Sequence, residues 1–243
     1  MGLPADTAFN LVWDFSNFQW YMVPFLLVVI YMISKEVQKE NWSAILAAIA
    51  FWLMDWVNEL WNAVIYHFKG APFWSTPGVP IAPGVYAPNS SLVILVGLNI
   101  EITFMFLMMG FVSTKMFKGT IQEELRISDS AEQKLYRRKR ITNRILIILS
   151  MAALCVIVEI ILNLIGILVW EWNGAGSQPN LWSISNPILI YIIGYLPFWG
   201  MSALIYDMKK RWLQVVIVGT MSIIVIIAFV TMAFLGWLAP PII

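Results

Sequence analysis

The chain has 243 residues, of which 60% are hydrophobic and only 12% charged, with a net charge of +1 and a mean hydropathy of +0.77. Soluble domains carry about a quarter charged residues, so this composition excludes a soluble protein and predicts a polytopic membrane protein. The net charge gives no indication of a nucleic-acid partner. One cysteine, Cys155, excludes a disulfide framework. The N-terminus lacks a basic start, so no cleavable signal peptide is expected.

Six apolar runs approach the length of about 20 helical residues that crosses roughly 30 Å of hydrocarbon. They cover about residues 18–34, 43–66, 91–114, 145–169, 187–206 and 213–237. The sequence thus predicts an all-α polytopic membrane protein, a bundle of six transmembrane helices in one domain, 1–243.

Four polar or mixed stretches accompany these runs. Residues 1–15 mix acidic and aromatic side chains and indicate a short interfacial helix. The Pro- and Gly-rich stretch 69–90 cannot form a regular helix, so it and the Trp- and Gly-containing stretch 170–186 predict outer capping loops. Residues 115–144 predict a cytoplasmic loop with a short amphipathic helix.

The basic residues predict the orientation. Fourteen of the fifteen Lys and Arg residues fall in three alternate loops, around 35–39, 115–144 and 209–211. By the positive-inside rule these loops are cytoplasmic and both termini lie outside. Membrane lipids are the expected partners of these charges.

The second run contains four polar side chains on one helical face. Asp55, Asn58, Glu59 and Asn62 follow the i, i+3, i+4, i+7 spacing. Carboxylates inside a hydrocarbon span are costly, so they should face a protein interior or a wet cavity.

Three further runs carry polar or aromatic faces. The additional residues are Asn99, Glu101, Glu159, Asn163, Tyr191, Tyr195 and Trp199. We expect these faces to enclose a pocket in the outer half of the bilayer, roofed by the two capping loops. No Lys or Arg lies within a span, and burial disfavours a charged carboxylate. Some of the acids should therefore be protonated, hydrogen-bonded or bound to a cation.

These residues give a catalytic and a binding set. The predicted catalytic residues are Glu59, Glu159, Asp55 and Glu101, and the predicted substrate-binding residues are Asn58, Asn62, Asn99, Asn163, Tyr191, Tyr195 and Trp199. The alternative is that these groups only hold helices together through interhelical hydrogen bonds. One histidine, His67, excludes a His-rich di-iron site. No cofactor is expected, and the remaining metal option is an all-oxygen site for Mg²⁺, Mn²⁺ or Ca²⁺.

The first 115 residues resemble the small integral-membrane terpene cyclases of fungal meroterpenoid and bacterial indole-terpenoid pathways. The matching stretch is Trp56-Val-Asn-Glu59 in the second span, and this span comes after a charged turn. The resemblance implies that a buried acid protonates an epoxide or alkene of a prenylated substrate, with Glu59 in that role. A second acid nearer the C-terminus has only Asp207 as a loose counterpart. These cyclases have seven spans and lack the long basic loop.

Three functions fit these patterns. The first is an enzyme that performs acid–base chemistry on a lipophilic substrate such as an isoprenoid or lipid. The second is a proton- or cation-coupled transporter, although no internal repeat is evident. The third is a non-catalytic subunit or assembly factor, for which thirteen Trp and thirteen Met residues offer an adaptable surface to membrane protein partners.

Overall fold

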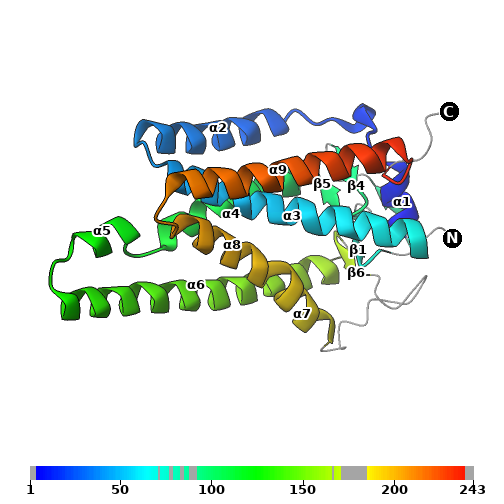
Figure 1. The fold of residues 1–243 in the computed structure, drawn as a ribbon. Helices are drawn as coiled ribbons and strands as arrows, with labels where there is room; N and C mark the ends of the chain where they lie inside the picture. Colours follow the sequence, from blue (N-terminus) through cyan, green and yellow to red (C-terminus); the bar gives the residue numbers. More distant parts are fainter. Residues whose placement is uncertain are drawn as a thin grey trace.

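The computed structural model describes residues 4–70, 72–76, 79–82, 85–87, 92–165, 167–170 and 185–238. The helices are α1 (Pro4–Asn10), the short 3-10 turn η1 (Phe15–Asn17), α2 (Met22–Gln38), α3 (Trp42–Lys69), α4 (Ile100–Met116), α5 (Ile121–Arg126), α6 (Ser130–Leu164), α7 (Ser185–Leu189), the π-helical turn η2 (Ile190–Tyr195), α8 (Leu196–Tyr206) and α9 (Arg211–Phe234). The long helices run side by side in an elongated bundle (Figure 1).

Five helical segments of the described chain are long and apolar enough to cross a membrane. They are α3, Ile100–Arg126, α6, Pro187–Tyr206 and α9. α2 corresponds to the first predicted span, but its 17 residues reach only about 26 Å. A multi-pass helical membrane protein is therefore confirmed. The sixth crossing stays a prediction.

Helix α3 is the centre of the bundle and packs against α4, α8 and α9. Small side chains allow this, because its first turns bury Ala44, Ala47, Ala48 and Ala50. Helix α3 approaches α4 closely at Gly110, where an added Cβ would lie 2.6 Å from the Ala48 carbonyl oxygen. Small residues at such crossings let helix backbones pack tightly in membranes.

Three predicted helix boundaries differ in the structure. The third run, 91–114, does not begin as a helix: β4 (Val93–Leu95) and β5 (Leu98–Asn99) pair antiparallel, and α4 starts after them. Asn99 caps α4 by accepting a hydrogen bond from the Ile102 N–H at 2.8 Å. The fourth helix starts inside the predicted loop 115–144, because Asp129 caps the N–H groups at the start of α6. α6 then ends at Leu164 rather than 169.

The loops carry short antiparallel strands that an all-α reading did not anticipate. β1 (Trp74–Ser75) pairs with β6 (Val169–Trp170), and β2 (Val79–Ala82) pairs with β3 (Val85–Ala87). The β1–β6 pair joins the two predicted capping loops, 69–90 and 170–186. Residues 171–184 of the second loop lie outside the described residues.

The turn between α2 and α3, the segment from α4 to α6, and the turn between α8 and α9 gather at one end of the bundle (Figure 1). Helix α1, the C-terminal end of α9 and the labelled strands lie at the other end. In the described chain all five ion pairs are at the first, charged end. The alternation of basic loops thus matches the arrangement of the helices, whereas the side of the membrane that each end faces stays a prediction.

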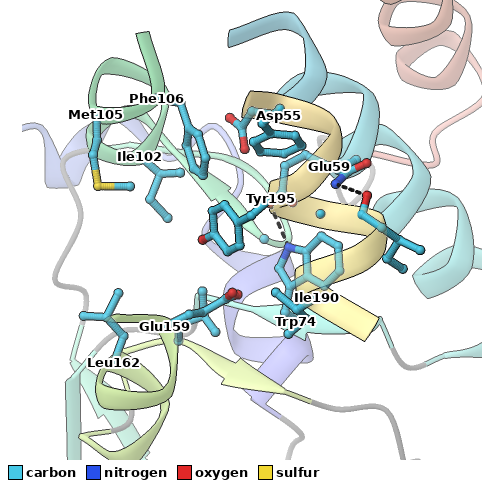
Figure 2. Close-up of a pocket in the computed structure, with 16 residues that line it drawn as sticks. Asp55, Glu59, Trp74, Ile102, Met105, Phe106, Glu159, Leu162, Ile190 and Tyr195 are labelled. Atoms are coloured by element: carbon cyan, nitrogen blue, oxygen red, sulfur yellow. Dashed lines mark hydrogen bonds between the residues drawn. The ribbon is translucent and has the colours of Figure 1, made fainter. Parts of the chain in front are cut away.

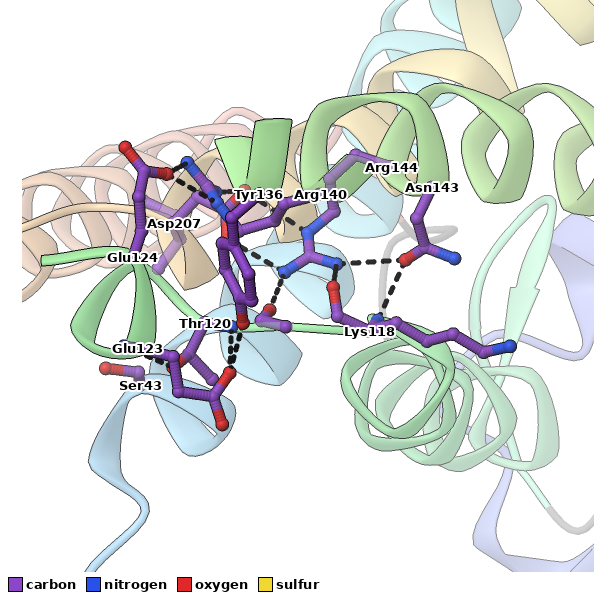
Figure 3. Close-up of polar contacts among 12 residues, drawn as sticks. Ser43, Lys118, Thr120, Glu123, Glu124, Tyr136, Arg140, Asn143, Arg144 and Asp207 are labelled. Carbon is purple, nitrogen blue, oxygen red and sulfur yellow. Dashed lines mark hydrogen bonds and ion pairs between the residues drawn. The ribbon is translucent and has the colours of Figure 1, made fainter. Parts of the chain in front are cut away.

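At the charged end, two buried arginines on α6 hold the neighbouring segments (Figure 3). Arg140 pairs with Glu124 of α5 and with Asp207 after α8. Arg144 pairs with the same Asp207 and donates hydrogen bonds to the Lys118 and Gly119 carbonyl oxygens. The long basic segment is therefore fixed to the bundle rather than free in solution.

Candidate functional site

A pocket lies among α3, α4, α6 and the η2–α8 segment, toward the strand-bearing end of the bundle (Figure 2). Its polar lining residues are Asp55, Asn58, Glu59, Glu159 and Tyr195, and the rest of its wall is mainly apolar or aromatic. Its volume is about 80 Å³, which compares with roughly 30 Å³ for one water molecule in the liquid. The pocket therefore has room for a few waters or for one end of a larger molecule.

Glu59 is held by a tryptophan from a strand. Trp74 of β1 donates its indole N–H to Glu59 Oε1 at 2.7 Å. Gly97, in the turn between β4 and β5, leaves the space for this arrangement, because a Cβ there would collide with Glu59 Oε2 and lie 2.7 Å from Trp74. A residue without a side chain is needed where the turn passes so close to the carboxyl group.

Asn62 fixes the strand that brings Trp74 to Glu59. Its Oδ1 accepts from the Phe73 N–H at 2.8 Å, and its Nδ2 donates to the Trp74 carbonyl oxygen at 2.8 Å. Both ends of the amide of this fully buried side chain thus bind backbone groups, one in Phe73 just before β1 and one in Trp74 within it. It faces the strand, and it is not among the residues that line the pocket.

Glu159 is held in the same way from the opposite side. Trp170 of β6 donates its indole N–H to Glu159 Oε1 at 3.3 Å. Trp170 and Trp74 are directly paired in the β1–β6 ladder. One short sheet thus carries the hydrogen-bond donors for both glutamates.

The three pocket carboxyls are buried and incompletely satisfied. Asp55, Glu59 and Glu159 are 2%, 5% and 7% exposed. Each has one buried oxygen with no hydrogen-bond partner in the described part of the chain. None of them takes part in the ion pairs found there, which are all at the charged end. Since buried polar groups are normally satisfied, such orphaned oxygens call for an explanation such as a ligand, a proton or water.

Two further polar residues border the carboxyls. In Figure 2 the Tyr195 ring lies between Asp55 and Glu159, with its hydroxyl group toward Glu159. Asn58 also lines the pocket and donates to the Ile193 carbonyl oxygen at 3.5 Å. Asp55, Glu59 and Asn58 come from one face of α3, as their spacing predicts, whereas Glu159 and Tyr195 reach the pocket from α6 and η2.

The other predicted site residues are not brought to the pocket lining. Glu101 accepts a hydrogen bond from Tyr21, which ties α2 to α4. Asn99 caps α4, and the Tyr191 hydroxyl donates to the Leu149 carbonyl oxygen at 3.2 Å. Trp199 is packed edge-on against Phe51 in the core.

Two more candidate residues, Asn163 and Asp207, also lie outside the pocket lining. Asn163 is buried with both polar side-chain atoms lacking a partner among the described residues, outside the pocket lining. Asp207, the loose counterpart of a second cyclase acid, belongs to the arginine network at the charged end. Glu159 is the acid that the fold places near Glu59.

The sequence did not single out Trp74, Trp170 or Gly97. Trp74 and Trp170 fell within the two predicted capping loops, and Gly97 fell inside a predicted helix. A useful signal was the presence of a Trp in each of the two capping loops, since a buried indole N–H seeks an acceptor. Within the described chain, no group of three His, Cys, Asp or Glu residues is arranged to hold a metal ion, and the all-oxygen metal site stays an untested alternative.

Comparison with known proteins places this architecture in a family. A family model for an uncharacterized membrane protein family matches residues 4–234. The chain belongs to this family. An uncharacterized protein of Archaeoglobus fulgidus is 36% identical over 236 residues, which cover 96% of this chain and 98% of the relative. No solved structure matches the chain. Membership of this family supports an integral, multi-pass membrane protein. None of these findings tests the resemblance to terpene cyclases, which stays a prediction.

Proposed function

We propose that this protein is a membrane enzyme that performs acid–base chemistry on the reactive end of a lipophilic substrate, in the manner of a terpene cyclase. The observation that carries the proposal is the convergence of three buried carboxyls on one largely apolar pocket, each with an oxygen that no described residue partners. Groups that served only to join helices would be expected to use these oxygens in hydrogen bonds with one another or with neighbouring helices.

The chemistry follows from the surroundings of the acids. With no cation paired to it, a buried carboxyl is far cheaper to hold in its protonated form than as an anion. Glu59 or Glu159 can then donate a proton to an alkene or epoxide. The resulting carbocation is stabilised by the ring faces of Tyr195 and Phe106. The carbocation then loses a proton to the carboxylate of the glutamate that donated one, which regenerates the acid, so the net reaction is an isomerisation or cyclisation without a redox step.

The pocket volume sets the part of the substrate that reacts there. About 80 Å³ is well below the roughly 300–1,000 Å³ of sites that enclose a drug-sized ligand. An isoprenoid or lipid chain must therefore remain largely outside the pocket, among the helices or in the bilayer, while its terminal group enters.

The test uses the purified chain in lipid nanodiscs, a panel of polyprenyl alkenes and epoxides, and D₂O. A general acid of this kind transfers solvent deuterium to a product that is an isomer of the substrate. Replacing Glu59→Gln or Glu159→Gln should lower turnover by about 100-fold or more, the usual contribution of a general acid. Glu101→Gln is the matched control, because Glu101 lies outside the pocket lining, and it should retain turnover.

Retention of full turnover by both pocket variants would contradict the proposal. Ion-gradient-driven uptake in proteoliposomes that is lost in the same two variants would instead support a proton- or cation-coupled transporter. A complex that loses a tightly bound membrane partner on mutation, with no turnover of any probe, would support the non-catalytic subunit.

A further inference from the structure

A second, polar cavity lies at the charged end of the bundle, away from the carboxyl pocket. It forms where three segments meet: the turn into α3, the start of α5, and the turn between α8 and α9. Its volume is about 510 Å³, far larger than the carboxyl pocket. Its polar lining includes Ser43, Thr120, Gln122, Lys209, Arg211 and Gln214.

The cavity has an excess of positive charge. Lys209 and Arg211 line it and are exposed, and neither forms an ion pair within 4.0 Å in the part of the chain that the structure describes. Glu40 is the single acid of the lining. Among nearby acids outside the lining, Glu124 and Asp207 pair with the α6 arginines, and Glu123 accepts hydrogen bonds from the Thr120 N–H and the Tyr136 hydroxyl, as Figure 3 shows. The two cations therefore remain available to an anion.

Hydrogen bonds of a buried side chain fix the base of the cavity. Gln214 is 1% exposed, and its Nε2 donates to the Ile205 carbonyl oxygen at 2.7 Å and to Ser43 Oγ at 3.1 Å. These bonds hold the first turns of α3 and α9 together. The backbone N–H groups at the start of α9 add further donors near Arg211, because its N-cap residue Lys210 makes no side-chain capping bond.

Tryptophans mark the depth of the cavity relative to a membrane. Trp42 lines it and Trp212 follows Arg211, and both rings are exposed. Exposed tryptophans of membrane proteins concentrate at the level of the lipid headgroups. A cavity at that level with two unpaired cations and several hydroxyl and amide groups suits a phosphate group, which takes charge-assisted hydrogen bonds from Arg and Lys.

We propose that this cavity binds a phosphate group, carried either by a membrane lipid or by a free phosphate compound. The site is independent of the acid–base chemistry proposed for the carboxyl pocket. It gives the cluster of basic residues at 209–211 a specific ligand in addition to its part in membrane topology.

The experiment measures binding to the full chain in two arms. In the first, the protein in neutral phosphatidylcholine nanodiscs is titrated with phosphatidic acid; in the second, the protein in neutral detergent is titrated with inorganic diphosphate. The double variant Lys209→Gln/Arg211→Gln should bind about tenfold more weakly or worse in whichever arm shows binding. The control Lys134→Gln/Arg137→Gln removes the same charge from the exposed face of α6 and should bind as the wild type does.

A variant that is expected to tighten binding makes the test independent of folding defects. Glu40→Gln removes the acid from the lining and should tighten binding severalfold. Binding only in the lipid arm would assign the site to a lipid headgroup, and binding only in the diphosphate arm to a free phosphate compound; both results support a phosphate site. Absence of binding in both arms, or equal weakening by the α6 control, would overturn the proposal.

Discussion

Trp74 and Trp170 lie directly opposite each other in the β1–β6 pair, and each donates its indole N–H to a different buried glutamate. Glu59 on α3 and Glu159 on α6 are thereby oriented by one small sheet. Two helices that are far apart in the sequence are thus tied to the same strand pair. The sheet therefore gives a fixed geometry to a pocket whose acids come from distant parts of the sequence.

Removal of either indole donor tests this constraint. Trp74→Phe or Trp170→Phe should each lower the free energy of unfolding by about 1–3 kcal/mol, because a buried glutamate oxygen loses its partner. The double variant should deviate from additivity, because the two residues are in contact. Thermal unfolding in detergent measures both effects.

Trp61→Phe is the matched control for the indole variants. Trp61 is on the same helix as Glu59 but is 58% exposed, so its replacement should change stability little. Equal losses for Trp61→Phe and Trp74→Phe would show that the hydrogen bond to Glu59 is not what matters.

The contact between α3 and α4 supplies a prediction about packing. Alanine is favoured over glycine within a helix by about 1 kcal/mol, yet Gly110→Ala should destabilise the protein by about 1–3 kcal/mol. The reason is that its Cβ would collide with the Ala48 backbone. Gly219→Ala on α9 meets no atom within 4 Å and should leave stability unchanged or raise it. Opposite signs in thermal unfolding are the expected result, and a loss at both positions would contradict it.

Glu36 supplies a prediction about pH at the charged end, beyond the predicted span 18–34. Burial raises the pKa of this carboxyl, but hydrogen bonds from Lys115 and Asn41 and the charges of Lys115 and Lys39 outweigh it, so the pKa lies below its ordinary value of 4.5. A lowered folded-state pKa stabilises the protein above 4.5, and this stabilisation is lost as the pH falls through the folded-state value.

The measurement compares unfolding temperatures at neutral pH and at about pH 3.5. The difference should be smaller in Glu36→Gln, which lacks the titrating group, than in the wild type. Glu132→Gln replaces an exposed glutamate of α6 and should keep the wild-type difference. An unchanged pH dependence in Glu36→Gln would show that this ion pair does not stabilise the charged end.

The sequence predicted the α3 face of the pocket because a helix fixes the direction of residues at i, i+3 and i+4. It also placed Glu159 and Tyr195 on inward faces. It misplaced Glu101 and Asn99, because the apolar run 91–98 suits a buried strand as well as a helix, and periodicity alone does not separate the two. The roles of Trp74 and Gly97 depend on contacts between residues distant in the chain, and no local pattern reports such contacts.

We propose that Asp55, Glu59 and Glu159 are held in one pocket as uncharged acids. Infrared spectroscopy of the protein in nanodiscs tests it directly, since the carbonyl band of a carboxylic acid is resolved from the bands of a carboxylate. We expect this band at neutral pH, with a loss of intensity in Glu59→Gln, in Glu159→Gln or in Asp55→Asn. No such loss is expected in a variant with a replaced surface glutamate, Glu132→Gln. A spectrum without the acid band at neutral pH, or a band that none of the three pocket substitutions reduces, would contradict the claim.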